Sequence, residues 1–283
     1  PMSEKLLSKT MTDLSMSGKS PGTCATYLAC IEQLYAFVDK PLSKLTREDI
    51  VDFMQYGTTE RRLSPSSLRL IAVAIRFFCK VTLGRPRLVE GLKAQRVTLK
   101  PVTVLSVAVV EKFISSMESP THYAIASVLY GTGMRLSEAL AITADDIHDD
   151  RGIITVPHSK TRQARVARLS VELLVRLRNY WRFRRPQSRL LFHGVDPSKP
   201  MCQTPVQSAF RQASEAAGLP QRVTPHVLRH THATHLLESG VDLFTVQKLL
   251  GHACIESTLC YLNVSTSHLA GQRIELPPLL QPR

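Results

Sequence analysis

A repeated start signal, serine or threonine followed by proline, most constrains what this chain can fold into. It precedes three segments whose apolar residues recur with helical spacing, at Ser20-Pro21, Ser64-Pro65 and Thr224-Pro225. A serine or threonine side chain can cap the first N–H groups of a helix, and a proline at the first helical position has no N–H that needs a partner. We therefore expect a mainly helical protein.

The first hundred residues show helical periodicity only, in segments 23–38, 46–56 and 64–84. We expect a small all-helical domain over residues 1–92. The segment KAQRVTLKPVT, residues 93–103, is basic, contains a proline and has no amphipathic period, which is typical of an interdomain linker.

A second domain is expected over residues 104–283, including a C-terminal tail. Its apolar pattern predicts helices at 106–117, 123–130, 171–182, 204–217, 224–239 and 242–250, with a further helix starting near Arg135. Two β-branched runs, 153–157 and 166–169, are joined by HSKTRQAR and predict a hairpin with a basic tip. The predicted fold class is mainly α, with a helical N-terminal domain and a mostly helical α+β second domain that carries a small antiparallel sheet.

The charge of the chain points to a polyanionic partner. Lys and Arg number 36 against 23 Asp and Glu, which gives a net charge of +13. Residues 1–100 alone have a net charge of +7, from 16 Lys and Arg against 9 Asp and Glu. Nucleic acid is the leading partner, and the alternative is a solvated basic surface with no such role.

No run of about 18 apolar residues and no signal-peptide pattern occurs, so we expect a cytoplasmic protein without a membrane partner. The six cysteines form no C-x-x-C motif, which favours reduced, buried thiols.

The stretch HVLRHTHATH, residues 226–235, holds four histidines and one arginine. His226 and His230 share a helix face, but the glutamate of H-E-x-x-H is absent and the guanidinium of Arg229 would repel a divalent cation, so a metal site is disfavoured. His226 and Arg229 lie three apart near a helix N-terminus, where an anion is favoured. For this pair alone, an ion pair with an acidic neighbour is a simpler explanation than a phosphate pocket.

Motifs on both sides of this stretch favour the phosphate pocket. They are G-T-G-x-R-x-x-E at residues 131–138 with Arg135, H-x-x-R with His226 and Arg229, L-G-H at 250–252 with His252, and Tyr261 nine residues later. In these motifs the sequence resembles the tyrosine recombinases, the integrase family that cuts and rejoins DNA through a tyrosine. The resemblance covers the second domain, and most of the chain if residues 1–92 are the family's core-binding domain.

The resemblance implies a set of six catalytic residues: Arg135, Lys160, His226, Arg229, His252 and Tyr261. Lys160 in HSKTRQAR matches the family's hairpin lysine, with Arg162 and Arg165 as competitors for that role. Supporting roles are implied for Glu138, Asp146 and His230, whereas His232 and His235 are expected to be packing or surface residues. Each catalytic candidate taken alone has an ordinary explanation, and for Arg135 it is a salt bridge to Glu138, three residues on.

The residue types suit phosphodiester transfer. Two guanidiniums can hold the non-bridging oxygens, His252 can donate a further hydrogen bond, and His226 can accept the phenol proton or orient the phosphate. Tyr261 would attack, Lys160 would protonate the departing 5′ oxygen, and a 3′-phosphotyrosyl link would store the energy of the cut bond. The chemistry requires no metal, cofactor or ATP.

We therefore expect a site-specific DNA recombinase that clamps duplex DNA and works as a homo-tetramer on two DNA sites, exchanging strands through a Holliday junction. Accessory proteins are not indicated by the sequence. The alternatives are a type IB topoisomerase, which would relax any supercoiled plasmid, and a sequence-specific DNA-binding protein that does not cut. The tail after Asn263 is expected to dock on a neighbouring subunit.

Overall fold

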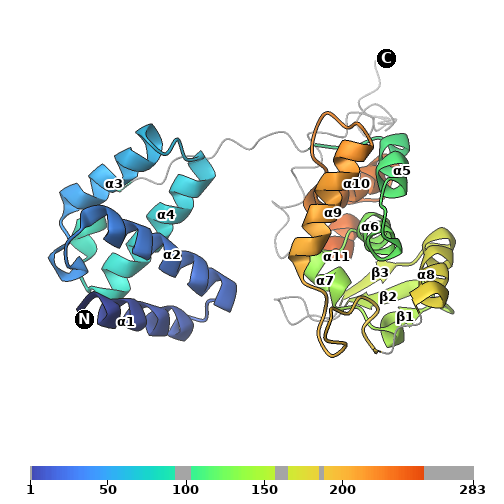
Figure 1. The fold of residues 1–283 in the computed structure, drawn as a ribbon, viewed down its shortest axis with the longest axis horizontal. Coiled ribbons are helices and arrows are strands. Elements are labelled where there is room, and N and C mark those ends of the chain that lie inside the picture. The colour runs from blue at the N-terminus through green and yellow to red at the C-terminus, as the bar shows by residue number, and fades with distance from the viewer. Residues whose placement is uncertain (1, 93–102, 157–164, 185–187, 252–283) are drawn as a thin grey trace, which may run out of the picture. The chain divides into compact units, whose positions relative to one another are not determined.

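The computed structural model describes residues 2–92, 103–156, 165–184 and 188–251. The chain divides into two compact units, Pro1–Lys100 and Pro101–Arg283 (Figure 1). Helices dominate both units, and the described β structure is one small antiparallel sheet in the second, so the predicted fold class is confirmed.

The first unit is entirely helical in its described residues. Its elements are α1 (Met2–Met16), α2 (Pro21–Val38), α3 (Arg47–Thr59) and α4 (Pro65–Phe77), with short helical segments at Leu42–Lys44, Phe78–Thr82 and Pro86–Val89. The start signals work as predicted, since the hydroxyls of Ser20 and Ser64 accept hydrogen bonds from the N–H groups of Thr23 and Ser67.

Helix α1 was not predicted. Its sequence is mostly polar, and among its residues whose burial the structure describes, Leu14 is the one hydrophobic residue that is fully buried. The helix packs against α2 and the Phe78–Thr82 turn, so tertiary contact rather than a strong apolar stripe stabilises it. The core of this unit is formed by Ile31, Leu34, Ile50, Phe53, Ile75 and Phe78.

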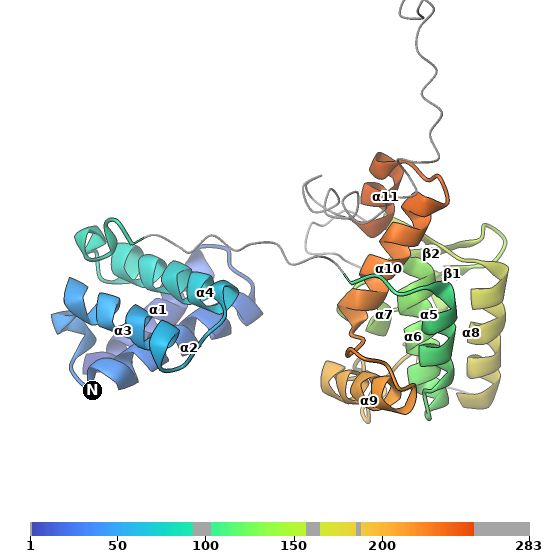
Figure 2. The ribbon, with the colours of Figure 1, turned by 90° about the horizontal axis from the view of Figure 1, so that it is seen from above.

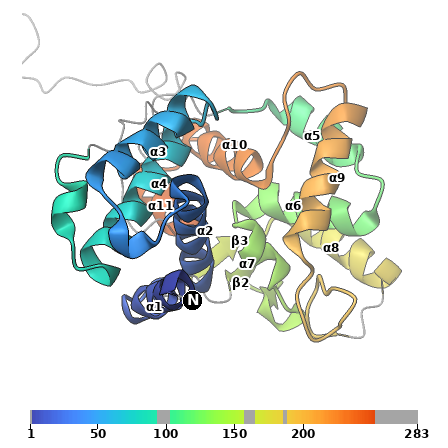
Figure 3. The same ribbon diagram turned by 60° about the vertical axis from the view of Figure 1, so that its left-hand side comes forward.

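The second unit is built around α6 (Pro120–Thr132), in which every residue from Ala124 to Leu129 is buried. Against it pack α5 (Val107–Ser115), α7 (Leu136–Leu140), α8 (Val171–Arg184) and α10 (Pro225–Glu238), as Figures 2 and 3 show from two directions. The structure also describes α9 (Gln203–Ala216), α11 (Leu243–Leu250) and a short helical segment at Ala144–Asp146.

The sheet of the second unit has the order β1-β2-β3, with β1 (Ile147–His148), β2 (Ile153–Val156) and β3 (Arg165–Arg168). The predicted hairpin strands pair antiparallel, with Ile154 opposite Ala167, and the tip between them lies outside the described residues. Strand β1 was not predicted because two residues are too short to show an alternating pattern.

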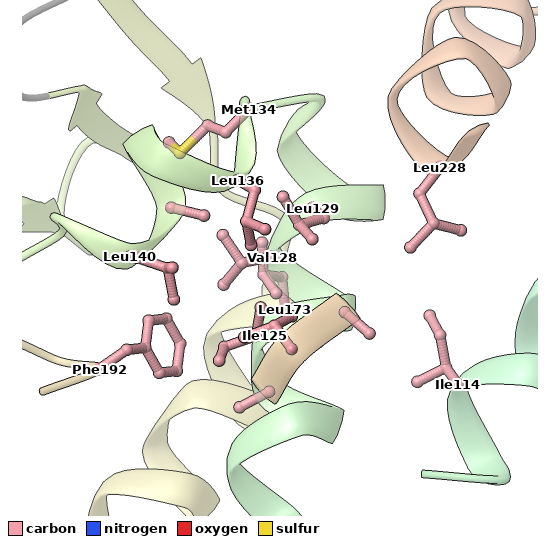
Figure 4. Close-up of a cluster of buried hydrophobic side chains, with 14 of the residues drawn as sticks. Ile114, Ile125, Val128, Leu129, Met134, Leu136, Leu140, Leu173, Phe192 and Leu228 are labelled. Carbon is pink, nitrogen blue, oxygen red and sulfur yellow. The ribbon is translucent and has the colours of Figure 1, made fainter. Parts of the chain in front are cut away.

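A large apolar cluster fixes α6 within this unit. Ile125, Val128 and Leu129 of α6 lie among Leu140, Leu173 and Phe192, which come from three other parts of the chain (Figure 4). Leu136 and Leu228 of the same cluster directly neighbour Arg135 and Arg229 in the chain, so the core is the scaffold that positions these charged residues.

Cys24, Cys30 and Cys79 are buried free thiols, but Cys202 is exposed, which corrects the expectation that all six cysteines are buried; Cys254 and Cys260 lie outside the described residues. Cys202 precedes α9 and is not part of its apolar face. None of the described helices is long and apolar enough to cross a membrane.

Candidate functional site

The N-terminus of α10 presents the H-x-x-R pair. Thr224 caps the helix by accepting the Val227 N–H at 3.3 Å, and Pro225 occupies the first turn. His226 is exposed and lines a pocket of ≈ 310 Å³ together with Gln203, Gln207 and Arg222, whereas Arg229, one turn further along, is only 4% exposed. The same helix therefore offers an accessible imidazole and a buried guanidinium.

The Arg229 guanidinium joins the ends of two helices. Its Nη1 donates to the carbonyl of Gly133 at 2.7 Å, and its Nη2 donates to the carbonyl of Leu250 at 2.8 Å. These carbonyls belong to the C-terminal ends of α6 and α11, where the last C=O groups of a helix lack partners and where positive charge is favoured. Arg229 therefore fixes the G-T-G motif and the L-G-H motif relative to each other.

Arg135 lies directly before α7 and remains accessible. Its Nη1 pairs with Glu138 at 2.7 Å, its side chain is 39% exposed, and its Nη2 lies 3.4 Å from the carbonyl of Gly251. The salt bridge proposed as the ordinary explanation for Arg135 is therefore present. It occupies only part of the guanidinium, and the carbonyls that Arg135 and Arg229 contact are adjacent in the chain.

Glu138 is the buried anion that these cations share. Its side chain is 4% exposed, and its Oε2 accepts the Arg135 backbone N–H at 2.8 Å and lies 4.0 Å from Arg229 Nη1. Burial alone would raise the pKa of this carboxyl, but the Arg135 N–H and the charge of Arg165 outweigh it, so the pKa is lowered and Glu138 is ionised. Asp146, another implied supporting residue, instead accepts hydrogen bonds from the backbone N–H and the hydroxyl of Thr143. It contacts no arginine among the described residues.

Arg165 is a member of this cluster that sequence reasoning misplaced. Its side chain is 8% exposed, its Nη2 donates to Glu138 Oε2 at 2.6 Å, and its Nη1 donates to the carbonyl of Leu249. This guanidinium is buried, is paired with Glu138 and belongs to β3, so the structure argues against Arg165 as a competitor of Lys160. The buried position was not visible in the sequence because Glu138 and Leu249 are distant from it in the chain.

His226 and His230 of α10 are biased toward their neutral forms. Although His226 is partly open to solvent, desolvation by the surrounding protein, followed by the charges of Arg229 and Arg135, lowers its pKa. Desolvation also lowers the pKa of His230, which is half-buried, with His226 and Arg229 adding to the effect. A neutral His226 can accept a proton.

The other two histidines pack on α6. His235 Nδ1 lies 3.0 Å from the Tyr130 hydroxyl, and burial lowers the pKa of His232 to about 4 despite a hydrogen bond with the backbone of Tyr130. The His232 ring also lies against Gly133, where an added Cβ would be 2.6 Å from its Cδ2. Both side chains help to position α10 on α6.

Three of the six predicted catalytic residues, Arg135, His226 and Arg229, are described by the structure, and all three belong to this cluster. The other three, Lys160, His252 and Tyr261, lie outside the described residues, as does Arg162. Within the described part of the chain, no group of three or more His, Cys, Asp or Glu is placed to hold a metal ion. The described cluster presents guanidiniums and an imidazole near the N-terminus of α10, groups that favour the binding of an anion.

Comparison with known proteins gives the family. The phage integrase family model matches residues 103–268, and the model of the phage integrase N-terminal SAM-like domain matches residues 6–87. A putative integrase/recombinase, y4qK, of Sinorhizobium fredii is 35% identical over 90% of this chain and 83% of its own length. Tyrosine recombinase XerA of Pyrococcus horikoshii is 28% identical over 98% of this chain and 94% of its own length.

The fold is shared with a solved structure as well. A lambda integrase dimer bound to a COC′ core site superimposes with a TM-score of 0.73 at 18% identity, over 97% of each chain. The family model covers more than half of the chain, with the described arginines and His226 inside the matched range. The chain therefore belongs to the phage integrase family and is a tyrosine-type site-specific DNA recombinase.

Proposed function

We propose that this recombinase cleaves duplex DNA with Tyr261 while Arg135 and Arg229 hold the scissile phosphate. The observation that carries the proposal is that these two arginines, from distant parts of the chain, contact the adjacent carbonyls of Gly251 and Leu250 at the end of α11. His252 follows directly in the sequence. Guanidinium donors so placed can bind non-bridging phosphate oxygens.

The charge of the described cluster matches the reaction. Three guanidiniums, from Arg135, Arg165 and Arg229, surround the single carboxylate of Glu138, which leaves two positive charges. A phosphodiester carries one negative charge, and its pentacovalent transition state carries two. The cluster is thus more complementary to the transition state than to the ground state, which is the requirement for rate acceleration.

The phenolic oxygen of Tyr261 bonds to phosphorus as the bond to the 5′ oxygen breaks, His226 receives the phenol proton, and Lys160 gives a proton to the 5′ oxygen. His252 donates a hydrogen bond to the phosphate. The 3′-phosphotyrosyl bond keeps the energy of the broken linkage, so a 5′-hydroxyl from the partner strand can reverse the step without ATP.

The proposed domain roles follow the two units. Residues 1–92 form a core-binding domain, 93–103 a linker and 104–283 the catalytic domain with its tail. The excess of basic residues in the first unit supports DNA contacts through phosphates, which give affinity rather than sequence specificity. Four subunits on two sites would exchange strands pairwise through a Holliday junction.

A suicide substrate tests the proposal. A nicked duplex carrying the protein's own target sequence loses a short 5′-hydroxyl fragment after cleavage, so the covalent complex accumulates and survives denaturing gel electrophoresis. Wild-type protein should give this complex, and Tyr261→Phe, which lacks the nucleophilic oxygen, should give none. Equal trapping by both proteins would contradict the assignment of Tyr261. Conversion of a plasmid with two target sites to recombinant products distinguishes a recombinase from an enzyme that only relaxes DNA.

A further inference from the structure

We propose, resting on the function proposed above, that Arg165 is a positioning residue: it ties strand β3 to Glu138 and to the end of α11, and through Glu138 it sets where the Arg135 guanidinium lies. Arg165 begins β3, the strand that follows the segment carrying Lys160. Arg165 is therefore placed to connect β3, the Arg135–Glu138 pair and the end of α11, three parts of the chain that contribute to the proposed cleavage reaction.

The contacts of Arg165 are those of a bridge between backbone and carboxylate. Nη2 lies 2.6 Å from Glu138 Oε2, and Nη1 donates to the Leu249 carbonyl. The side chain also packs closely against Gly251, since a Cβ added there would be 2.6 Å from Arg165 Cδ and 2.8 Å from its Nε. Gly251 has φ +65°, which ends α11 in the left-handed conformation and leaves room for the guanidinium.

Together the three arginines contact three successive carbonyls at this helix end. Arg165 takes Leu249, Arg229 takes Leu250 and Arg135 reaches Gly251. Arg165 and Arg135 also donate side-chain hydrogen bonds to Glu138, one to each carboxylate oxygen. The position of the carboxylate, and hence of the exposed Arg135, therefore depends on Arg165.

Loss of Arg165 should change the site in two ways. The Glu138 carboxylate would keep its negative charge but lose its shortest partner, so it would draw more strongly on Arg135 and on Arg229, now 4.0 Å away. The net charge of the cluster would also fall by one. Both effects weaken the hold of the two remaining guanidiniums on phosphate in the transition state. Lysine cannot replace arginine fully because one ammonium does not offer the fixed, planar set of donors that reaches both Glu138 and the Leu249 carbonyl.

The test compares single-turnover cleavage of the suicide substrate by R165Q, R165K and the matched control R168Q. Arg168 lies on the same strand, is exposed and has the same charge, so R168Q reports the loss of a positive charge without the loss of the bridge. We expect R165Q to cleave about 10- to 100-fold more slowly than R168Q. DNA affinity should be similar for the two variants, and R165K should lie between R165Q and wild type.

A double variant separates positioning from general loss of structure. If Arg165 acts through Glu138, E138Q/R165Q should cleave no more slowly than the slower of the two single variants, because the two residues act as one unit. Fluorescence of Trp181, the single tryptophan, checks that each variant's second unit is folded.

R165Q as fast as R168Q, or a double variant slower by the product of the two single effects, would overturn the positioning role while leaving the proposed function in place. Wild-type protein that forms no covalent complex would overturn the proposed function, and this inference with it.

Discussion

Replacement of Gly133 by alanine should destabilise the second unit far more than the same change at Gly218. Both glycines have left-handed backbone conformations, with φ +64° and φ +61°. A Cβ at Gly133 would lie 2.6 Å from His232 Cδ2 and 2.8 Å from Leu250 Cδ2, whereas nothing lies within 4 Å of a Cβ at Gly218. The two sites therefore share the backbone strain and differ in the space available.

The magnitude follows from these two terms. A non-glycine residue in the left-handed conformation costs about 1–2 kcal/mol, which applies at both sites. Overpacking adds about 1–3 kcal/mol at Gly133 alone, because Leu250 is fully buried and His232 is held by the backbone of Tyr130. The loss of unfolded-state entropy on replacing glycine is common to both variants and cancels in the comparison. We expect G133A to be less stable than G218A by about 1–3 kcal/mol.

Urea unfolding followed by tryptophan fluorescence measures this difference. Trp181 is the single tryptophan and lies in α8, so the signal reports the second unit without interference from the first. The midpoint should fall further for G133A than for G218A, with the slope against urea unchanged. Midpoints that agree within error would refute the reasoning, since the close approach of α6 to His232 and Leu250 would then have no energetic cost.

Three further predictions concern cleavage of the suicide substrate. Arg229→Lys should reduce the rate by about 100-fold or more, because one ammonium cannot replace the guanidinium that spans Gly133 and Leu250; a near-normal rate with normal folding would contradict a phosphate-holding role. His226 must be neutral to accept a proton and its pKa is lowered from 6.5, so activity should persist as the pH falls through 6.5 and decline only below it; a midpoint above 6.5, or the same acid limb in His226→Asn, would count against it. Cleavage should be undiminished in excess EDTA, since guanidiniums supply the positive charge; loss of activity that Mg²⁺ or Zn²⁺ restores would show that a metal takes part.

Local signals in the sequence were sufficient for most helices. Serine and threonine caps followed by proline marked three starts correctly, because a cap acts within a few residues of the helix end. Helix α1 escaped because its stability comes from packing, which has no short-range pattern.

The motifs in the sequence also predicted the family, and through that resemblance the candidate residues Arg135, His226 and Arg229. Only the tertiary structure decided how these charges are balanced. It buries Glu138 and Arg165, exposes His226 and Arg135, and uses one helix end to hold three guanidiniums. Such pairings join residues far apart in the chain, and their strength depends on burial, which no local spacing encodes.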